Sequence, residues 1–481
     1  MKKDFFYTLL LSLSNILFPI LTFPYASRIL GPVGIGKVQI TSSFAQYFAL
    51  IAALGIPVYG MQEIAKRKNN KEALTKVFSE LTTIYLVTSF AVTIIYGCII
   101  LGIPYFQSNI SLYAYSGVLI LLGFTSIDWL YLGLEEFKLV ALRSILIKVI
   151  SVILLFSIVK EATDYTYFLG ILLFSILGNN VLNLLLIQNR TGFRFQNLRL
   201  TQHLKPLFFI FATAIVTSMY TVLDTVLLGF LSDEYSVGLY TISTKLAKLA
   251  LPFIISAGFV LIPKFALFNH ENKPEEIQRL LNKSWHFIIQ FSVPISIGLL
   301  ILSPEFIVAF SNHLFASATT SMRILSLLPV LVGIGYFFAF QVLLPMGKTK
   351  EIFFSVVGGM TIFLVANFLL VPALKDKGAA IANVLSEITV TGLYFYFIRK
   401  NAGFTIQWNL VVYGLLSTSL FLPIVLLIRY WQLSAITTLL VSVGLCIPSY
   451  FLIQYHIFKD RFLINFLKSY YDTLMQRNRQ S

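Results

Sequence analysis

Long apolar runs constrain the fold of this chain more than any other feature of its sequence. A membrane-spanning helix needs about 20 mostly apolar residues, and fourteen runs meet or nearly meet this length. They lie at 6–27, 38–60, 80–103, 112–134, 144–159, 165–187, 206–230, 239–263, 284–303, 319–345, 352–371, 378–398, 410–428 and 434–457. Charged residues make up only 12% of the chain, against about 25% in soluble domains. The sequence therefore predicts an all-α polytopic membrane protein.

Lysine and arginine are distributed unevenly between the two sides of this predicted topology. Of 36 such residues, 26 fall in the two termini and the loops on the same side, 6 fall in the opposite loops, and 4 lie inside spans. Cytoplasmic loops carry the excess of basic residues in membrane proteins. Both termini are therefore predicted to be cytoplasmic. The same asymmetry accounts for the net charge of +15, so no nucleic-acid partner is expected.

Charged residues inside apolar spans are the strongest functional signal, because each costs roughly 2.5–3.5 kcal/mol near a bilayer centre. Asp224 lies in the run 206–230, and Lys245 and Lys248 lie in the run 239–263. The two lysines are three residues apart and share one helix face. Lys245 and Asp224 lie at similar distances from the loop between their runs, so they could meet at one depth. Cavity-lining groups and a structural ion pair both fit this pattern.

Further charged candidates lie near or within other spans. Lys148 is inside the fifth span, and Arg323 is inside the tenth. Arg28 lies at the outer end of the first span, where a snorkelling anchor and a substrate contact both stay open. Asp128 belongs to the charged stretch 124–148, together with the interfacial residue Trp129.

Three segments outside the spans look amphipathic. They are 71–81, the linker 190–205 and the tail 459–481. We interpret them as cytoplasmic helices that lie on an anionic membrane leaflet.

A weak internal repeat relates the two halves of the chain. Leu30-Gly31 matches Leu228-Gly229, and Gly36 matches Gly238, with an insertion between them. Six predicted spans separate the copies, so both have the same orientation. This arrangement predicts parallel repeats, an architecture found among alternating-access transporters.

Motifs for other chemistries are absent or incomplete. GPVGIGKV at 31–38 matches most of a phosphate-binding loop, but Val38 replaces the Ser or Thr that holds magnesium, and membrane spans flank it. An outer turn with permissive glycines fits it better. The five histidines lie in separate segments, and the dispersed acids offer no acid–base pair. No cofactor, metal site or enzyme activity is therefore expected.

The segments FPYASRILGPVGIGK (23–37), IDWLYLGLEEFK (127–138) and LDTVLLGFLSDEYSVGLYTISTK (223–245) carry a family resemblance. The chain resembles the Wzx-type lipid-linked oligosaccharide flippases, which export O-antigen and capsule units. They form the polysaccharide branch of the multidrug/oligosaccharidyl-lipid/polysaccharide superfamily. The resemblance implies two six-helix bundles at 1–189 and 206–400, joined by the linker, with two extra spans at 401–458 before the tail.

The resemblance also implies a function for the buried charges. Arg28, Lys148, Lys245, Lys248 and Arg323 would line a cationic cavity for the diphosphate and sugar of an undecaprenyl-linked substrate. Asp224 and Asp128 would form ion pairs or couple transport to an ion. The expected location is the bacterial inner membrane. Membrane lipids, a polysaccharide polymerase and a chain-length regulator are expected partners.

Two rival functions stay open. A cation-coupled multidrug exporter of the same superfamily should prefer an acidic cavity. A membrane-embedded glycosyltransferase or polymerase would need a catalytic constellation and usually a large loop outside the membrane.

Overall fold

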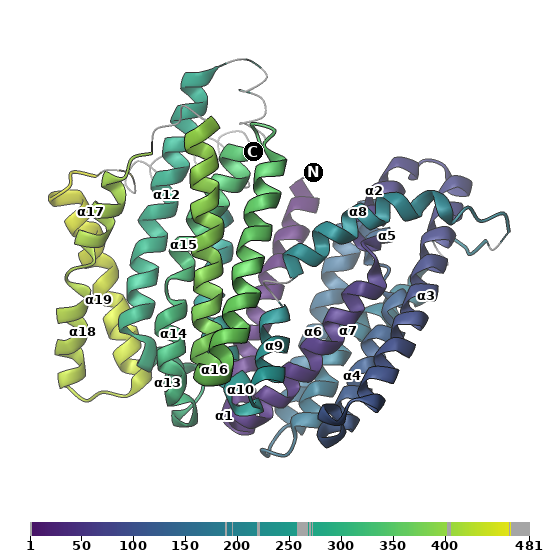
Figure 1. Ribbon diagram of the computed structural model, residues 1–481, viewed down its shortest axis with the longest axis horizontal. Helices are drawn as coiled ribbons and strands as arrows, with labels where there is room; N and C mark the ends of the chain where they lie inside the picture. The colour runs from purple at the N-terminus through teal and green to yellow at the C-terminus, as the bar shows by residue number, and fades with distance from the viewer. Residues whose placement is uncertain are drawn as a thin grey trace. The chain divides into compact units, whose positions relative to one another are not determined.

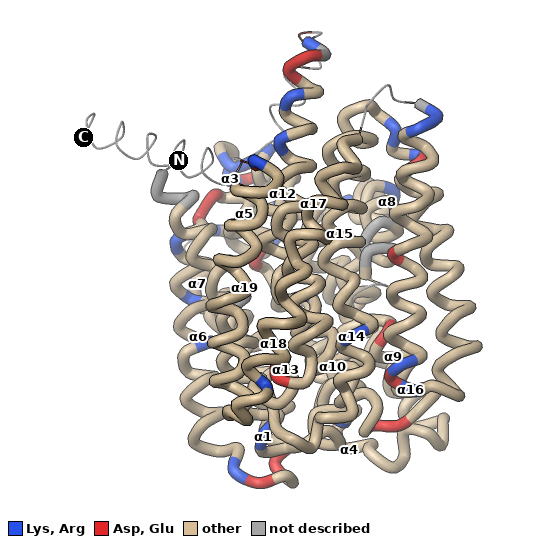
Figure 2. The backbone as a smooth tube through the Cα atoms, turned by 90° about the vertical axis from the view of Figure 1, so that its left-hand side faces the viewer, with Lys and Arg blue, Asp and Glu red and all other residues tan. Residues whose placement is uncertain are grey.

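The computed structural model describes residues 2–187, 190–194, 196–218, 222–256, 273–401, 406–460 and the single residues 268, 271 and 462. These residues form helices and connecting turns, with no β-strand among them (Figure 1). Long stretches of the helices carry no charged residue (Figure 2), as a lipid environment requires. The predicted all-α polytopic membrane fold is confirmed.

The helices of the first part of the chain are α1 (Lys2–Ala53), α2 (Ile56–Arg67), α3 (Lys71–Gly102), η1 (Pro104–Asn109), α4 (Ile110–Leu121), η2 (Gly123–Thr125), α5 (Asp128–Gly133), α6 (Phe137–Ile158), α7 (Tyr165–Leu186), α8 (Thr201–Ser218), α9 (Asp224–Leu231) and α10 (Glu234–Lys248). The later helices are α12 (Pro274–Ile301), α13 (Ser303–Phe310), η5 (His313–Ala318), α14 (Thr319–Leu325), α15 (Leu328–Tyr336), η6 (Phe337–Leu343), α16 (Thr349–Asn401), α17 (Asn409–Ser417), α18 (Phe421–Tyr430) and α19 (Ala435–His456).

Eleven helical stretches in the described residues are long and apolar enough to cross a membrane. Two of them each cover two predicted spans and bend between those spans. The first bends at Gly31, whose φ of 64° suits glycine, and the second at Lys375, whose φ is 52°. Every predicted span except 206–230 overlaps one of the eleven stretches. That span coincides with α8 and α9, and residues 219–221 between them lie outside the described residues.

The chain divides into two compact units, Met1–Thr241 and Ile242–Ser481, and the division falls inside α10. In the first unit, α1 packs against α3, α4 and α6. An aromatic cluster strengthens this packing: the ring of Phe44 contacts those of Tyr96, Phe106 and Tyr113 at centroid distances of 5.1–5.9 Å. The predicted domain boundaries at 189, 205 and 400 stay predictions.

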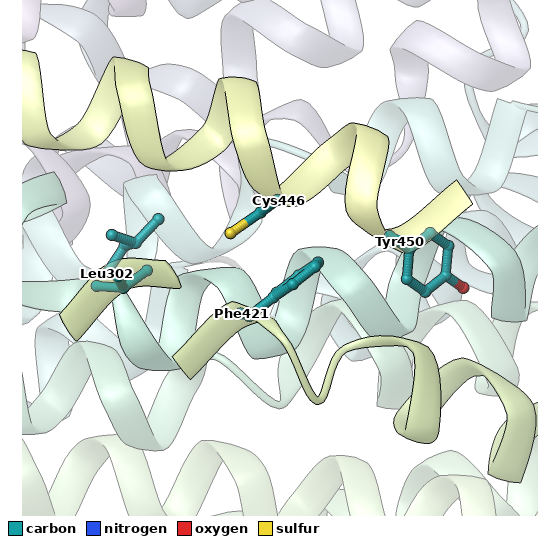
Figure 3. Close-up of a cluster of buried hydrophobic side chains, with 5 residues drawn as sticks. Leu302, Phe421, Cys446 and Tyr450 are labelled. Carbon is teal, nitrogen blue, oxygen red and sulfur yellow. The ribbon is translucent and has the colours of Figure 1, made fainter. Parts of the chain in front are cut away.

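In the second unit, α12 packs against α15 and α17, while α19 packs against α13 and α18. Leu302, Phe421, Cys446 and Tyr450 come together from three different parts of this unit and, with Val425, form a buried apolar cluster (Figure 3). Beside it, Arg429 donates two hydrogen bonds to the Glu305 carboxylate, at 2.7 and 2.9 Å. This cluster and ion pair hold the C-terminal helices against α12 and α13.

The amphipathic segments 71–81 and 190–205 differ from their prediction as helices on the membrane surface. Residues 71–81 begin α3, and Leu74, Val77, Phe78 and Leu81 are buried within the protein. Residues 190–194 and 196–200 are not helical, and α8 begins at Thr201. The two segments pack on each other: the apolar stripe of α3 meets linker residues such as Phe193, whose ring lies 5.3 Å from that of Phe78.

Polar contacts fix this linker to the first unit. Arg190 pairs with Glu136 and Arg194 pairs with Glu72, both at 2.6 Å. The fully buried Glu80 carboxylate accepts hydrogen bonds from the Arg199 backbone N–H, at 2.7 Å, and from the Gln202 side chain. We name the segment 190–203 with these contacts the linker clasp. The tail 463–481 lies outside the described residues.

Candidate functional site

The predicted cationic residues of the first unit lie on α1 and α6. Arg28 is on α1 with an exposed side chain, three residues before the bend at Gly31. Lys148 is half-buried on α6 and donates hydrogen bonds to Ser14 Oγ, at 3.1 Å, and to Asn15 Oδ1 of α1. Desolvating an ammonium group in a membrane helix is costly, and these two acceptors offset part of that cost. Lys148 therefore links two spans of the first unit.

The other predicted cations belong to the second unit. Lys245 and Lys248 are half-buried in the last turn of α10, which ends at Lys248. The next residues form a turn, so the apolar stretch 234–256 is interrupted within its length. The carbonyl groups at a helix C-terminus favour nearby cations. Arg323 is exposed on α14. The predicted cavity between the two halves stays a prediction.

Asp224 is a buried carboxylate at the start of α9, with 3% of its surface exposed. Its Oδ1 accepts a hydrogen bond from the Thr225 backbone N–H at 2.7 Å, and its Oδ2 accepts one from the Tyr240 hydroxyl of α10 at 3.0 Å. Hydrogen bonding of this kind makes a buried carboxylate tolerable. Asp224 therefore connects α9 to α10, and its predicted pairing with Lys245 stays a prediction.

Asp128 belongs to a polar cluster at the start of α5. Its Oδ1 accepts hydrogen bonds from Arg143 of α6 at 2.5 Å and from Asn183 of α7 at 2.8 Å. Arg143 is 5% exposed and also lies over the ring of Tyr131, with 5.1 Å between the guanidinium carbon and the ring centroid. Asp128 thus forms an ion pair with Arg143, and its predicted role in transport stays a prediction.

The repeated glycines of the sequence meet each other's segments within the first unit. A Cβ atom at Gly36 would lie 1.7 Å from the Glu234 carbonyl oxygen, and one at Gly238 would lie 2.0 Å from the Pro32 carbonyl oxygen. Glu234 precedes Gly238 by four residues, just as Pro32 precedes Gly36. The two copies of the repeat therefore make the same backbone contact in reciprocal fashion. We call this contact the glycine crossing.

Two ionisable groups were not among the predicted residues: Glu387, which is half-buried, and His203, which is buried. Glu387 of α16 lies within electrostatic range of Lys248, and His203 bridges Glu80 (2.9 Å) and the Tyr59 hydroxyl (3.0 Å). The signal for Glu387 is in the sequence, since it is an acidic residue inside the predicted span 378–398, as Asp224 is inside the run 206–230. The role of His203 depends on tertiary contacts between distant segments, which no local pattern reveals.

A family model described as polysaccharide biosynthesis protein matches residues 1–268, more than half of the chain. The chain belongs to the polysaccharide biosynthesis protein family. This family member is 25% identical over 395 residues to a "Putative O-antigen transporter" of Shigella dysenteriae, covering 81% of this chain and 98% of the relative. It is 24% identical over 408 residues to a protein of the same name from Escherichia coli (strain K12), covering 83% and 97%.

Two solved structures show where this polysaccharide biosynthesis protein belongs by fold. "Lipid II flippase MurJ, inward closed conformation" matches with a TM-score of 0.72 at 15% identity, over 95% of this chain and 99% of that one. An inward-facing multidrug resistance MATE family transporter of the MOP superfamily matches with a TM-score of 0.62 at 14% identity, over 80% and 93%. The predicted resemblance to polysaccharide transporters is confirmed by the family and the two relatives, and the two solved structures share the fold of this chain.

Proposed function

We propose that this protein is a flippase that moves an undecaprenyl-diphosphate-linked oligosaccharide from the cytoplasmic to the outer leaflet. The family, the names of the two relatives and the fold shared with a lipid flippase support a transporter of polysaccharide precursors. In this role the protein catalyses no covalent chemistry and works by alternating access. It resides in the bacterial inner membrane with both termini in the cytoplasm.

The observation that carries this proposal is the pair of lysines at the interruption of α10. Lys245 and Lys248 lie in the last turn of a helix that ends within an apolar stretch. Broken helices in transporters provide substrate sites because their ends present polar groups within the membrane. Two ammonium groups on one face supply point charges that attract phosphate oxygens. A diphosphate headgroup matches this chemistry better than a cationic drug does.

The remaining charges have supporting roles in the same mechanism. Arg28, Lys148 and Arg323 are further candidate contacts for the headgroup, while the lipid tail stays in the membrane. Asp128 forms an ion pair with Arg143. Asp224, buried where α9 meets α10, is a candidate for coupling to an ion. A polysaccharide polymerase and a chain-length regulator would act on the exported unit at the outer leaflet.

The test replaces Lys245 and Lys248 by alanine, singly and together, in a strain that lacks the chromosomal gene. We expect the double variant to accumulate lipid-linked glycan in the inner leaflet while its membrane abundance stays near normal. Lys245→Arg/Lys248→Arg keeps the charges and should retain most transport. Lys160→Ala, in the loop between α6 and α7, is the matched control outside the spans.

Two results would contradict the proposal. Full export by the double alanine variant would show that the lysines do not carry the headgroup. Export of cationic drugs by the wild-type protein, with no glycan accumulation in the deletion strain, would favour the multidrug exporter.

A further inference from the structure

A small polar pocket lies at the end of the first unit that the basic-residue count assigns to the outer side. It has a volume of about 200 Å³ and is enclosed by the start of α10, the loop before it, η1 and the middle of α1. Its polar lining includes Lys37, Asn109, Ser232, Asp233 and Glu234. Drug-sized ligands occupy pockets of about 300–1,000 Å³, so this one suits a ligand the size of a single sugar ring.

Several polar atoms of this pocket have unused hydrogen-bonding capacity. Asn109 Nδ2 donates to Glu234 Oε1 at 2.7 Å, and among the described residues neither Asn109 Oδ1 nor Glu234 Oε2 has a partner. The Ser232 hydroxyl is buried and also lacks one within the described chain. Of the three atoms the Ser232 hydroxyl is the buried one, and a buried polar atom without a partner needs an explanation. A ligand with several hydroxyl groups could satisfy all three atoms.

The pocket holds charges of both signs. Lys37 supplies one positive charge, which lies over the ring of Tyr165 at 5.0 Å from its centroid. Asp233 and Glu234 supply two carboxylates, and Asp233 Oδ1 accepts a hydrogen bond from the Ser236 backbone N–H at 2.8 Å. The Glu234 carboxylate repels an anion at close range, whereas it forms strong hydrogen bonds with neutral hydroxyl groups.

An aromatic wall completes the pocket. Tyr105 is 40% exposed and Tyr113 is buried, and both line the cavity. The position of Tyr105 is fixed by its hydroxyl, which donates to the Gly229 carbonyl oxygen at 2.6 Å, and by contact with Phe230 at 5.0 Å between centroids. Aromatic rings offer an apolar face to the C–H groups of a ligand while their edges stay polar. Polar edges beside an aromatic wall match the two faces of a pyranose.

We infer that this pocket binds one neutral sugar residue of the exported glycan on the outer side of the membrane. The inference rests on the proposed function and adds a second substrate contact, separate from the lysines of α10. Asn109 and Glu234 orient the hydroxyl groups, Ser232 accepts or donates a further bond, and Tyr105 contacts the ring. Such a site would hold the headgroup after translocation.

Saturation-transfer NMR on the purified full-length protein in detergent tests this site. The probes are glucose, galactose and N-acetylglucosamine as neutral sugars, with glucuronate as the anionic comparison. We expect saturation transfer to at least one neutral sugar and none to glucuronate. Asn109→Ala and Glu234→Gln should each weaken that binding by about tenfold. The first removes the amide that bonds a sugar hydroxyl group, and the second replaces a charged acceptor by a neutral one. Glu161→Gln, an acid-to-amide change in another outer loop, should bind as the wild type does.

The outcomes separate this inference from the proposed function when export is measured in parallel. No transfer to any neutral sugar, or equal transfer in the two pocket variants, overturns the inference, even where export is intact. Neutral-sugar binding that is lost in both variants supports the site. If export of lipid-linked glycan fails in the wild type while sugar binding persists, the proposed function is overturned and the pocket stands. A monodisperse size-exclusion profile for each variant confirms that its fold is retained.

Discussion

The glycine crossing gives the sharpest test of how this fold opens. In Gly36→Ala, the new methyl group would lie 1.7 Å from the Glu234 carbonyl oxygen and 2.6 Å from its carbon. Ordinary contact begins at 3.4 Å, so the two segments must separate by roughly 1.7 Å. Both clashing atoms belong to the backbone and cannot turn aside as a side chain would. The substitution should therefore destabilise the crossing itself.

Overpacking of this kind costs about 1–3 kcal/mol. If the crossing opens and closes in a two-state manner, this cost raises the ratio of open to closed forms by about 5–150-fold. Ser236 reports on the change because it lies on α10 beside the crossing and is only 1% exposed. Its replacement by cysteine should react slowly with a membrane-impermeant maleimide in the parent protein. Gly36→Ala should accelerate that reaction by a factor within the same range.

The assay needs a background without native thiols, so Cys98 and Cys446 are first replaced by serine and alanine. Gly97→Ala is the matched control, because a Cβ atom at Gly97 meets nothing within 4 Å. It should leave labelling unchanged and, in a helix, stabilise slightly. Equal labelling rates for Gly36→Ala and the parent protein would refute the reasoning. Loss of folded protein in every Gly36 variant would instead show that the crossing is needed for stability.

The remaining predictions concern two contacts at the ends of helices. Glu305→Ala should lower the melting temperature in detergent, because it removes two charged hydrogen bonds worth about 1.5–3 kcal/mol. The exchange Glu305→Arg/Arg429→Glu should recover part of the lost melting temperature. An unchanged melting temperature in Glu305→Ala would argue against a stabilising role for this pair. In the loop after α6, the backbone N–H groups of Lys160 and Glu161 donate to Asp164 and lower the pKa of its carboxyl below the ordinary 3.8. The contribution of the Asp164 carboxylate to loop stability should be complete above pH 3.8 and lost as the pH falls through the lowered pKa. Loss of amide-exchange protection in residues 159–164 should therefore appear only at acidic pH. Asp164→Asn should remove that pH dependence.

Hydropathy predicts the spans of this chain because lipid imposes its requirement on each helix separately. Every backbone group must bond within its own helix and each surface must be apolar, so a window of sequence is sufficient evidence. Glycine and loop residues likewise locate the bend at Gly31. The interruption of α10 after Lys248 does not show in the hydropathy, since the apolar run continues through it to residue 256. Its sequence signal is Pro252, which has no backbone N–H to bond the Lys248 carbonyl four residues earlier and whose ring clashes with that carbonyl.

The partners of buried polar groups could not be predicted from the sequence. Arg429 falls in the loop between the predicted spans 410–428 and 434–457, yet it pairs with Glu305, 124 residues away. Arg143 and Asn183 converge on Asp128 from two other helices. Such pairs depend on which helices become neighbours. Apolar helices of similar composition carry no local sequence pattern that specifies their neighbours. The amphipathic stripe of α3 was misread for the same reason, because its cover is another part of the protein.

The linker clasp shows that one arginine can act at two stages in the life of a membrane protein. During insertion the arginines of the chain have not yet formed ion pairs. In the predicted topology, Arg190 and Arg194 are then cations that resist translocation. After folding, Glu136 and Glu72 neutralise the same guanidinium groups. A count of basic residues therefore indicates the orientation in which a nascent chain inserts into the membrane. The same count overstates the positive charge that the folded surface presents to anionic lipids. Glu136→Gln or Glu72→Gln would leave membrane insertion unchanged and would leave one arginine without its neutralising partner.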